Sequence, residues 1–399
     1  MTALRGALRW AASAMRVEMG PQTLLPEEFR GIRWDRGLAI GTFGLLFIGL
    51  LMVYSATSSS ETRPAGHLLS QLLRVILGIG AFAAAYRIDY HRWGRLAPLL
   101  FLGGLVMLTL VWVPGVGHSA GGARRWITIA GITLQPSEFA RLGLVIYLAY
   151  LLSKPKVRLE RFATGLAPCL VAAGLVAGLV FKQPHLSMTL ALVAVTALML
   201  VAGRIPARHL GLSGAAVLLL LPFKVHGYQL ERFWQWLDYL MRGGQRLTGN
   251  YQLDQSILAI GSGGWHGRGF GDSRQKWSFL PEAHNDFIFA IVGEELGLVG
   301  AVVLIVLLGV LLWRAYDAAR RAPDRFGSLL ATGIGVGIAV YAGINMLVAT
   351  GLFPSTGLPL PLVSYGGTAV LVTLFSLGIL GNISSQGDSS LLVGIGEQE

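Results

Sequence analysis

The sequence predicts an all-α membrane protein, a polytopic bundle of about ten transmembrane helices. Hydrophobic residues make up 53% of the 399-residue chain, and charged residues make up only 13%. Apolar runs of about twenty residues, the length that an α-helix needs to cross a bilayer, recur along the whole chain. Because these runs take up most of the length, we expect one helical bundle rather than several soluble domains.

The expected spans follow one another between two tails, residues 1–37 and 384–399. Their ranges are 38–56, 67–86, 96–113, 138–152, 165–181, 188–203, 209–223, 287–313, 327–348 and 368–383. An even number of spans places both tails on one side. We expect the first run to stay in the protein as an anchor, because it follows a long tail and exceeds the apolar core of a cleavable signal peptide.

Arginine and lysine are concentrated in the connections 87–95, 154–161, 204–208 and 314–325, and six arginines precede the first span. By the positive-inside rule these segments and both tails are cytoplasmic. The longest connection, 224–285, is then extracytoplasmic. The net charge of +11 follows from this topology. Nucleic acid is not an expected partner, because the cationic loops are short and lack interleaved aromatic residues.

Two external connections carry positive charge against this rule. The first contains the paired Arg124 and Arg125, and the second contains Arg274 and Lys276 among several tryptophans. Tryptophan at a membrane surface serves equally to anchor helices at the level of the headgroups. For the cations we predict anion binding, since this side of the protein is otherwise poor in them.

A charge pair opens the fourth span. Pro136 suits the first turn of a helix, and Glu138 and Arg141 are three residues apart, so they share one face of it. Neither charge is tolerated alone in a bilayer, so we expect an ion pair. The pair either only locks the helix into the bundle or also lies beside a cavity and holds a catalytic acid or a bound anion in place.

The most informative segment is 280–290, which brings the carboxylate of Asp286 to the start of an apolar span. Glu294 and Glu295 follow within that span. Ionisable residues at this depth are costly and indicate function by default, although acidic residues also stabilise helix N-termini. The same approach to the span holds Glu282, His284, Arg274 and Lys276. We therefore predict a functional site at Asp286.

Two glycine-rich segments, 261–269 and 357–367, precede spans on the predicted side of Asp286. Irregular backbone at membrane depth occurs where protein buries it or where it lines a cavity. We expect both segments, with Ser364 in the second, to form walls of one cavity. Neither has the lysine and hydroxyl of a phosphate-binding loop, and zinc-ligand, nucleophile-elbow and dinucleotide motifs are absent from the sequence. The lack of an internal repeat disfavours a transporter.

Ordered motifs along nearly the whole chain resemble the SEDS family of shape, elongation, division and sporulation proteins. These motifs lie at 122–126, 135–138, 251–256, 259–264, 273–276, 281–290, 293–297 and 357–367. Within the family, segments 273–276 and 281–284 are closer to the FtsW division type than to the RodA type. A sporulation member is the alternative.

The resemblance implies the SEDS fold and a peptidoglycan glycosyltransferase that polymerises lipid II at the outer face of the cytoplasmic membrane. It places the family's essential aspartate on Asp286 and its intramembrane acid and base pair on Glu138 and Arg141. It also implies a class B penicillin-binding protein as partner, and Mg²⁺ or Mn²⁺ is a candidate cofactor. The residues expected to contact substrate are Arg124, Arg125, Arg274, Lys276, His284 and Ser364.

The sequence departs from the family pattern at three places. Arg141 stands where lysine is common, Asn285 where threonine is common, and His185 where aspartate is common. The first two changes are mild. The third change removes an acid, so any role of a carboxylate at position 185 is not expected here.

Glycan polymerisation needs a base for the attacking sugar hydroxyl and positive charge for the departing pyrophosphate. Asp286 is the expected base, by analogy with the carboxylate that activates water in inverting glycosidases. Two other classes of function stay open. A lipid II flippase would need ionisable residues along a path through the bundle, and a non-enzymatic division scaffold would not need Asp286.

Overall fold

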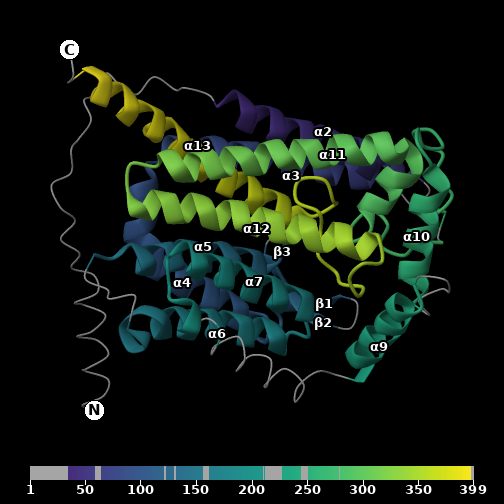
Figure 1. The fold of residues 1–399 in the computed structure, drawn as a ribbon. Helices are drawn as coiled ribbons and strands as arrows, with labels where there is room; N and C mark the ends of the chain where they lie inside the picture. Colours follow the sequence, from purple (N-terminus) through teal and green to yellow (C-terminus); the bar gives the residue numbers. More distant parts are fainter. Residues whose placement is uncertain are drawn as a thin grey trace. The chain divides into compact units, whose positions relative to one another are not determined.

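Figure 1 shows the fold as a computed structural model of the chain. The structure describes residues 35–58, 64–120, 123–129, 132–155, 161–209, 211, 227–243, 250–277 and 279–396. These residues are mainly helical and include one small sheet. The expected N-terminal tail and the expected span at 209–223 lie almost wholly outside them.

Every other expected span coincides with a helix, so the polytopic helical fold is confirmed for the described part of the chain. The helices are α2 (Arg36–Thr57), α3 (Pro64–Arg87), α4 (Tyr90–Leu110), α5 (Pro136–Ser153), the π-helical turn η2 (Phe162–Leu166) with α6 (Ala167–Lys182), α7 (Leu186–Ala202), α11 (Ile288–Arg321), α12 (Arg325–Ala349) and α13 (Gly367–Gly396). The C-terminal tail expected from residue 384 onward instead continues α13 as far as Gly396.

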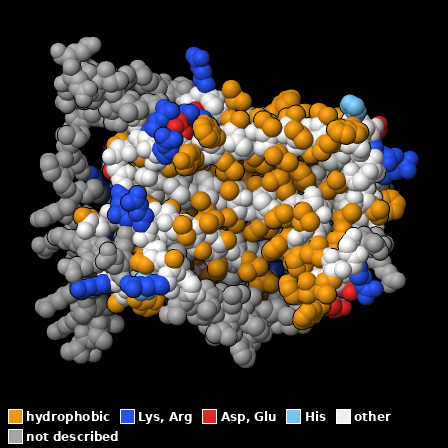
Figure 2. Space-filling model, viewed as in Figure 1, with side chains coloured by type: hydrophobic (Ala, Val, Ile, Leu, Met, Phe, Trp, Pro, Cys, Tyr) orange, Lys and Arg blue, Asp and Glu red, His pale blue; other side chains and the backbone are white. Residues whose placement is uncertain are grey.

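Seven described helices are long and apolar enough to cross a membrane, and α7 is a shorter apolar helix. Figure 2 shows apolar side chains across the middle of the visible face and lysine and arginine toward its ends. On α11 the exposed apolar residues are Leu298, Val299, Val302, Val303, Ile305 and Val306. A surface of this kind fits hydrocarbon as its solvent. The expected number of ten spans is not established by the described helices.

Helices pair along their lengths to form the bundle. α3 packs on α13, α4 packs on α5, and α11 packs against both α2 and α12, as Figure 1 shows. At one crossing the backbone of α2 nearly touches the segment before α13: a Cβ on Gly49 would lie 2.5 Å from the carbonyl oxygen of Leu362. Glycine is therefore required at position 49, because any side chain would push the two segments apart.

The connection between α4 and α5 forms a small antiparallel sheet that the all-α prediction did not include. Its strands β1 (Gly117–Ala120), β2 (Ala123–Ile129) and β3 (Ile132–Leu134) pair in the order β1-β2-β3. Successive side chains of a strand point to opposite faces. The sheet therefore separates Arg124, which is exposed, from Arg125, which is partly buried.

Two helices that the sequence analysis did not predict occupy the long connection 224–285: α9 (Gly227–Met241) and α10 (Tyr251–Gly263). Both are tied to the end of α12. Trp236 of α9 donates a hydrogen bond to the carbonyl of Gly351 at 3.1 Å, and Ser256 of α10 donates one to the carbonyl of Ala349 at 2.8 Å. The connection is thus a folded part of the molecule, and it delivers the chain to the start of α11.

α11 is broken at Gly297, where the backbone has φ 64° and ψ −160°. Glycine adopts this left-handed φ at no steric cost. The helix ends created by the break bond to the segment after α10. Leu298 and Val299 donate to the carbonyls of Gly264 and Trp265, and Arg268 and Gly269 donate to the carbonyls of Glu294 and Glu295, at 2.9 to 3.2 Å. Because protein groups satisfy the freed backbone, the break is tolerated within an apolar helix.

Candidate active site

Asp286 lies two residues before α11, on a backbone that is held from the opposite side. Three consecutive carbonyl groups each accept a hydrogen bond. His284 O accepts from Tyr365 N at 2.9 Å, Asn285 O from Ser364 Oγ at 2.6 Å, and Asp286 O from Asn345 Nδ2 at 2.8 Å. The segment 357–367 and α12 therefore fix the main chain at Asp286, as expected for a wall of the site.

The carboxylate of Asp286 is partly buried and lies against the backbone of Gly357. A Cβ on Gly357 would be 3.0 Å from Asp286 Oδ2, so a side chain there would crowd the carboxylate. Burial raises the pKa of Asp286 to about 7, the charge of Glu282 adds to the rise, and Arg125 opposes it. A carboxyl group with a pKa near neutrality is suited to accept a proton during a reaction.

Arg125 reaches the site from β2 and is held by the turn between α6 and α7. Its Nε donates to the carbonyl of Gln183 at 3.0 Å, and its guanidinium also donates to the carbonyl of Pro184. The arginine therefore joins the sheet to this turn and supplies positive charge to Asp286. Sequence reasoning predicted the cation but not the sheet that carries it.

His185 follows in the same turn, at the position where the family commonly has aspartate. The side chain is only 5% exposed, and its Nδ1 has no hydrogen-bond partner in the described part of the chain. Burial lowers the pKa of His185 to about 3, Arg125 lowers it further, and a backbone hydrogen bond at Gly357 opposes this. The imidazole is thus neutral, and it shares Gly357 as a neighbour with Asp286.

Glu138 and Arg141 form the expected ion pair inside the bundle. Arg141 donates to Glu138 Oε2 through Nη2 at 3.0 Å and through Nε at 3.2 Å, and both side chains are buried. The guanidinium carbon also lies 4.5 Å from the ring centroid of Tyr341 on α12. The pair therefore binds α5 to α12, which in turn holds Asp286 through Asn345.

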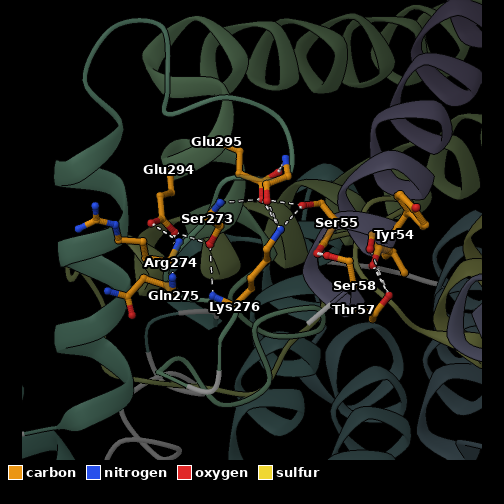
Figure 3. Close-up of polar contacts among 12 residues, drawn as sticks. Tyr54, Ser55, Thr57, Ser58, Ser273, Arg274, Gln275, Lys276, Glu294 and Glu295 are labelled. Atoms are coloured by element: carbon orange, nitrogen blue, oxygen red, sulfur yellow. Dashed lines mark hydrogen bonds and ion pairs between the residues drawn. The ribbon is translucent and has the colours of Figure 1, made fainter. Parts of the chain in front are cut away.

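Glu294 and Glu295 form a buried carboxylate clamp, which we call the Glu294–Glu295 clamp, with the loop before Asp286 (Figure 3). Glu294 accepts from Ser273 Oγ at 2.5 Å and from the amides of Arg274 at 2.9 Å and Gln275 at 3.4 Å. Glu295 accepts from Ser55 Oγ at 2.5 Å and from the amides of Gly271 at 3.1 Å and Ser273 at 3.2 Å, and lies 3.6 Å from Lys276 Nζ. The two carboxylates thus accept hydrogen bonds from the amides of this loop, and one of them pairs with its ammonium group.

Two residues that were expected to contact substrate, Lys276 and Ser364, make contacts within the protein. Lys276 is 7% exposed and contacts Glu295, Ser55 and the carbonyl of Gly271, and Ser364 is buried between Asn285 and Leu360. In this structure, protein groups therefore engage both residues. His284 is partly buried, with its ring 5.4 Å from that of Tyr365.

The remaining cations of the predicted set are the exposed Arg124 and Arg274 and the partly buried Arg125. The sequence marked all three as anion ligands, but only Arg125 acts electrostatically on Asp286 in the structure. Among the described residues, no three histidine, cysteine, aspartate or glutamate side chains converge on one metal position. No catalytic step is assigned to the candidate divalent cation.

A family model for FtsW, RodA and SpoVE, described as "Cell cycle protein", matches residues 36–389. The chain belongs to this family. A relative from Trichlorobacter lovleyi, named "Probable peptidoglycan glycosyltransferase FtsW", is 40% identical over 373 residues, covering 91% of this chain and 96% of the relative. Stage V sporulation protein E of Bacillus subtilis is 36% identical over 360 residues, covering 88% of this chain and 96% of that protein.

Solved structures of the family have the same fold. A chain from work described as "Structural coordination of polymerization and crosslinking by a peptidoglycan synthase complex" aligns with a TM-score of 0.73 at 26% identity, over 89% of this chain and 99% of that one. RodA of Thermus thermophilus aligns with a TM-score of 0.65 at 27% identity, over 89% and 97%. Together with the apolar helices, these matches establish a multi-pass membrane protein of the SEDS fold.

Proposed function

We propose that this chain is a peptidoglycan glycosyltransferase that polymerises lipid II at the outer face of the cytoplasmic membrane. FtsW relatives about 40% identical over most of the chain carry the name of this activity. The observation that carries the proposal is Asp286, a partly buried carboxyl group whose pKa lies near 7, on a backbone held at three consecutive carbonyls. Such a group can act as a base of fixed position that accepts one proton from the substrate.

In the proposed reaction, Asp286 takes the proton of the attacking sugar hydroxyl. The hydroxyl oxygen bonds to the anomeric carbon of the second lipid-linked sugar from the face opposite the leaving group, as in inverting enzymes. The bond from that carbon to pyrophosphate breaks, and lipid pyrophosphate leaves with the bonding electrons. Arg125 and the exposed Arg124 and Arg274 are the cations available to offset the charge that grows on pyrophosphate.

The position of the site suits a lipid-linked substrate. Asp286 precedes the first turn of α11, whose outward face is apolar. A polyprenyl tail can stay in hydrocarbon while the disaccharide reaches the carboxylate. The arginine distribution supports an extracytoplasmic site. Peptidoglycan is assembled on this side of the membrane.

A class B penicillin-binding protein is the proposed partner. One similar structure is described as a complex that coordinates polymerization with crosslinking. A transpeptidase held beside this site would crosslink the strand as it emerges. The FtsW relatives favour a role in division, and the match to a sporulation protein makes a role in sporulation the alternative.

The test is Asp286→Asn, assayed for lipid II polymerisation with purified protein and its partner. Loss of the base should lower the rate by about 10²- to 10⁴-fold. Because the raised pKa means that folding disfavours the charged form, the neutral asparagine should keep or raise thermal stability. The matched control is Asp238→Asn on the exposed face of α9, which should keep the parent rate.

The same experiment separates the alternatives. A scaffold would keep its partner and lose nothing measurable in Asp286→Asn. A flippase would show transbilayer movement of lipid II that depends on the protein, without glycan product. Near-parent glycan synthesis by Asp286→Asn would show that the catalytic assignment is wrong.

A further inference from the structure

The segment that carries Asp286 is closed at its base. It runs from Lys276 to Glu294, and these two ends meet in the Glu294–Glu295 clamp. Figure 3 shows Ser273, Lys276 and Ser55 converging on the two carboxylates from the loop and from α2. Closing a loop at its base restricts the conformations that the residues within it can adopt.

The clamp lies directly before the break in α11. Glu294 and Glu295 precede Gly297. Their carbonyl groups accept hydrogen bonds from the amides of Arg268 and Gly269, and their side chains accept from the amides of residues 271, 273, 274 and 275. The last turn before the break is therefore bonded through both backbone and side chains to one continuous stretch of loop. Movement of this loop must therefore change the part of α11 before Gly297, which begins two residues after Asp286.

Packing alone does not require two buried carboxylates at this position. Glu294 is 1% exposed and Glu295 is 0% exposed, and the only ion pair they make among the described residues is the one with Lys276. Replacing a buried charged group by an apolar one of similar size is often neutral or stabilising. The clamp has two carboxylates and one cationic partner. Backbone amides and hydroxyl groups supply the remaining hydrogen bonds, and this arrangement fixes the geometry of the loop.

We propose that the Glu294–Glu295 clamp is a positioning device for the glycosyl transfer: it holds the loop 271–276 and the part of α11 before Gly297 together so that the Asp286 carboxylate stays in its recess beside Gly357. This inference rests on the proposed function. Ser55 brings α2 into the device, because its hydroxyl reaches Glu295 from the end of the first described helix.

If the clamp is loosened, we expect a specific change at Asp286. Asp286 in a mobile segment is better hydrated, so its pKa falls from about 7 toward the usual carboxyl range. Of the charged and titratable neighbours that face it, Arg125 and His185 lie on other elements and stay in place, whereas Glu282 and His284 belong to the same segment and move with it. The maximal rate should fall because the base is misplaced, and the acidic limb of the rate profile should move to lower pH.

The experiment uses Glu294→Gln and Glu295→Gln, which keep shape and remove charge, and Ser55→Ala, which removes one hydrogen bond. Each full-length protein, with its partner, is assayed for lipid II polymerisation from roughly pH 5 to pH 9. We expect kcat to fall on the order of 10- to 100-fold with KM nearly unchanged, the scale for a misplaced catalytic group. Ser55→Ala should shift kcat and the acidic limb in the same direction by less.

The matched control is Glu231→Gln, the same substitution on the exposed side of α9. If Glu295→Gln deprives Lys276 of its carboxylate and the protein does not accumulate, the double variant Glu295→Gln with Lys276→Met removes both charges. This double variant and Ser55→Ala are then assayed in its place. The clamp assignment is overturned if folded variants keep the parent kcat, or if kcat falls only with the folded fraction while the acidic limb stays in place. Activity in Asp286→Asn would instead overturn the proposed function.

Discussion

The two ends of the bundle use partly buried carboxylates in opposite ways. At the end formed by the starts of α2 and α12, Asp35 and Asp324 cap helices and meet cations: Asp35 lies 2.6 Å from Arg314, and Asp324 lies 2.8 Å from His91. Burial alone would raise the pKa of each, but hydrogen bonds from these partners and from backbone amides lower it. At the other end, burial raises the pKa of Asp286.

This difference has consequences of opposite sign for stability. A carboxyl group whose pKa is lowered by folding stabilises the protein above its unfolded pKa, and that contribution is lost as pH falls through the folded value. A group whose pKa is raised destabilises the folded state as pH rises toward neutrality. Asp35 and Asp324 therefore hold helices together, whereas Asp286 costs stability at neutral pH, as expected at an active site.

The largest effect should come from the charge pair between these two ends. Glu138→Ala and Arg141→Ala each leave an unpaired charge inside the bundle, which should lower stability by about 3 to 5 kcal/mol. The exchange that places arginine at 138 and glutamate at 141 keeps a pair and should cost less. Unfolding in detergent, followed by heat or denaturant, measures the difference. Equal stability of both alanine variants and the parent would contradict a structural role for the pair.

A smaller effect is expected at the helix-capping end. Asp324→Ala removes the cap on Gly327 and the contact with His91, which should lower stability by about 1 to 2 kcal/mol. Asp324→Asn keeps a side-chain cap and should cost less. Neither variant should change the pH profile of polymerisation, because this end does not touch Asp286. A shifted profile in Asp324→Ala would show that the two ends are coupled.

The pH dependence of the polymerisation rate of the parent enzyme tests the same difference between the two ends. Protonated Asp286 cannot act as a base, so the polymerisation rate should fall about tenfold for each pH unit below about 7 and level off above it. Asp35 and Asp324 stay ionised over this window because their pKa values are lowered. Initial rates at constant ionic strength, with unfolding measured alongside, test this. A flat rate between roughly pH 5 and pH 8 would contradict Asp286 as the base.

Hydropathy was sufficient to predict the fold, because a helix in hydrocarbon satisfies its own backbone and needs no distant partner. The Glu138–Arg141 pair was equally predictable, since three-residue spacing places both side chains on one helical face. The family motifs placed Asp286, and its environment then followed from burial. In each case the signal lay within a few neighbouring residues.

Features made by long-range contacts were not predicted. The paired arginines at 124 and 125 were noted, but the aromatic and β-branched residues at 126–129, which favour a strand, were not used. Lys276 was expected to bind pyrophosphate, although the carboxylate that engages it lies 19 residues further along the chain, past the site. Gly297, two residues after Glu295, was the available signal for the break in α11, but the hydrogen-bond partners of the residues around it lie in another segment.

The hydrogen bond from Ser55 to Glu295 joins residues 240 positions apart. During synthesis at about 5 to 20 residues per second, α2 is therefore made roughly 12 to 48 seconds before its partner exists. Until then the nascent protein is anchored in the membrane without the contact that completes its catalytic end. A chain that stops before α11 lacks Glu294 and Glu295, so the proposed site can be completed only in the last part of translation.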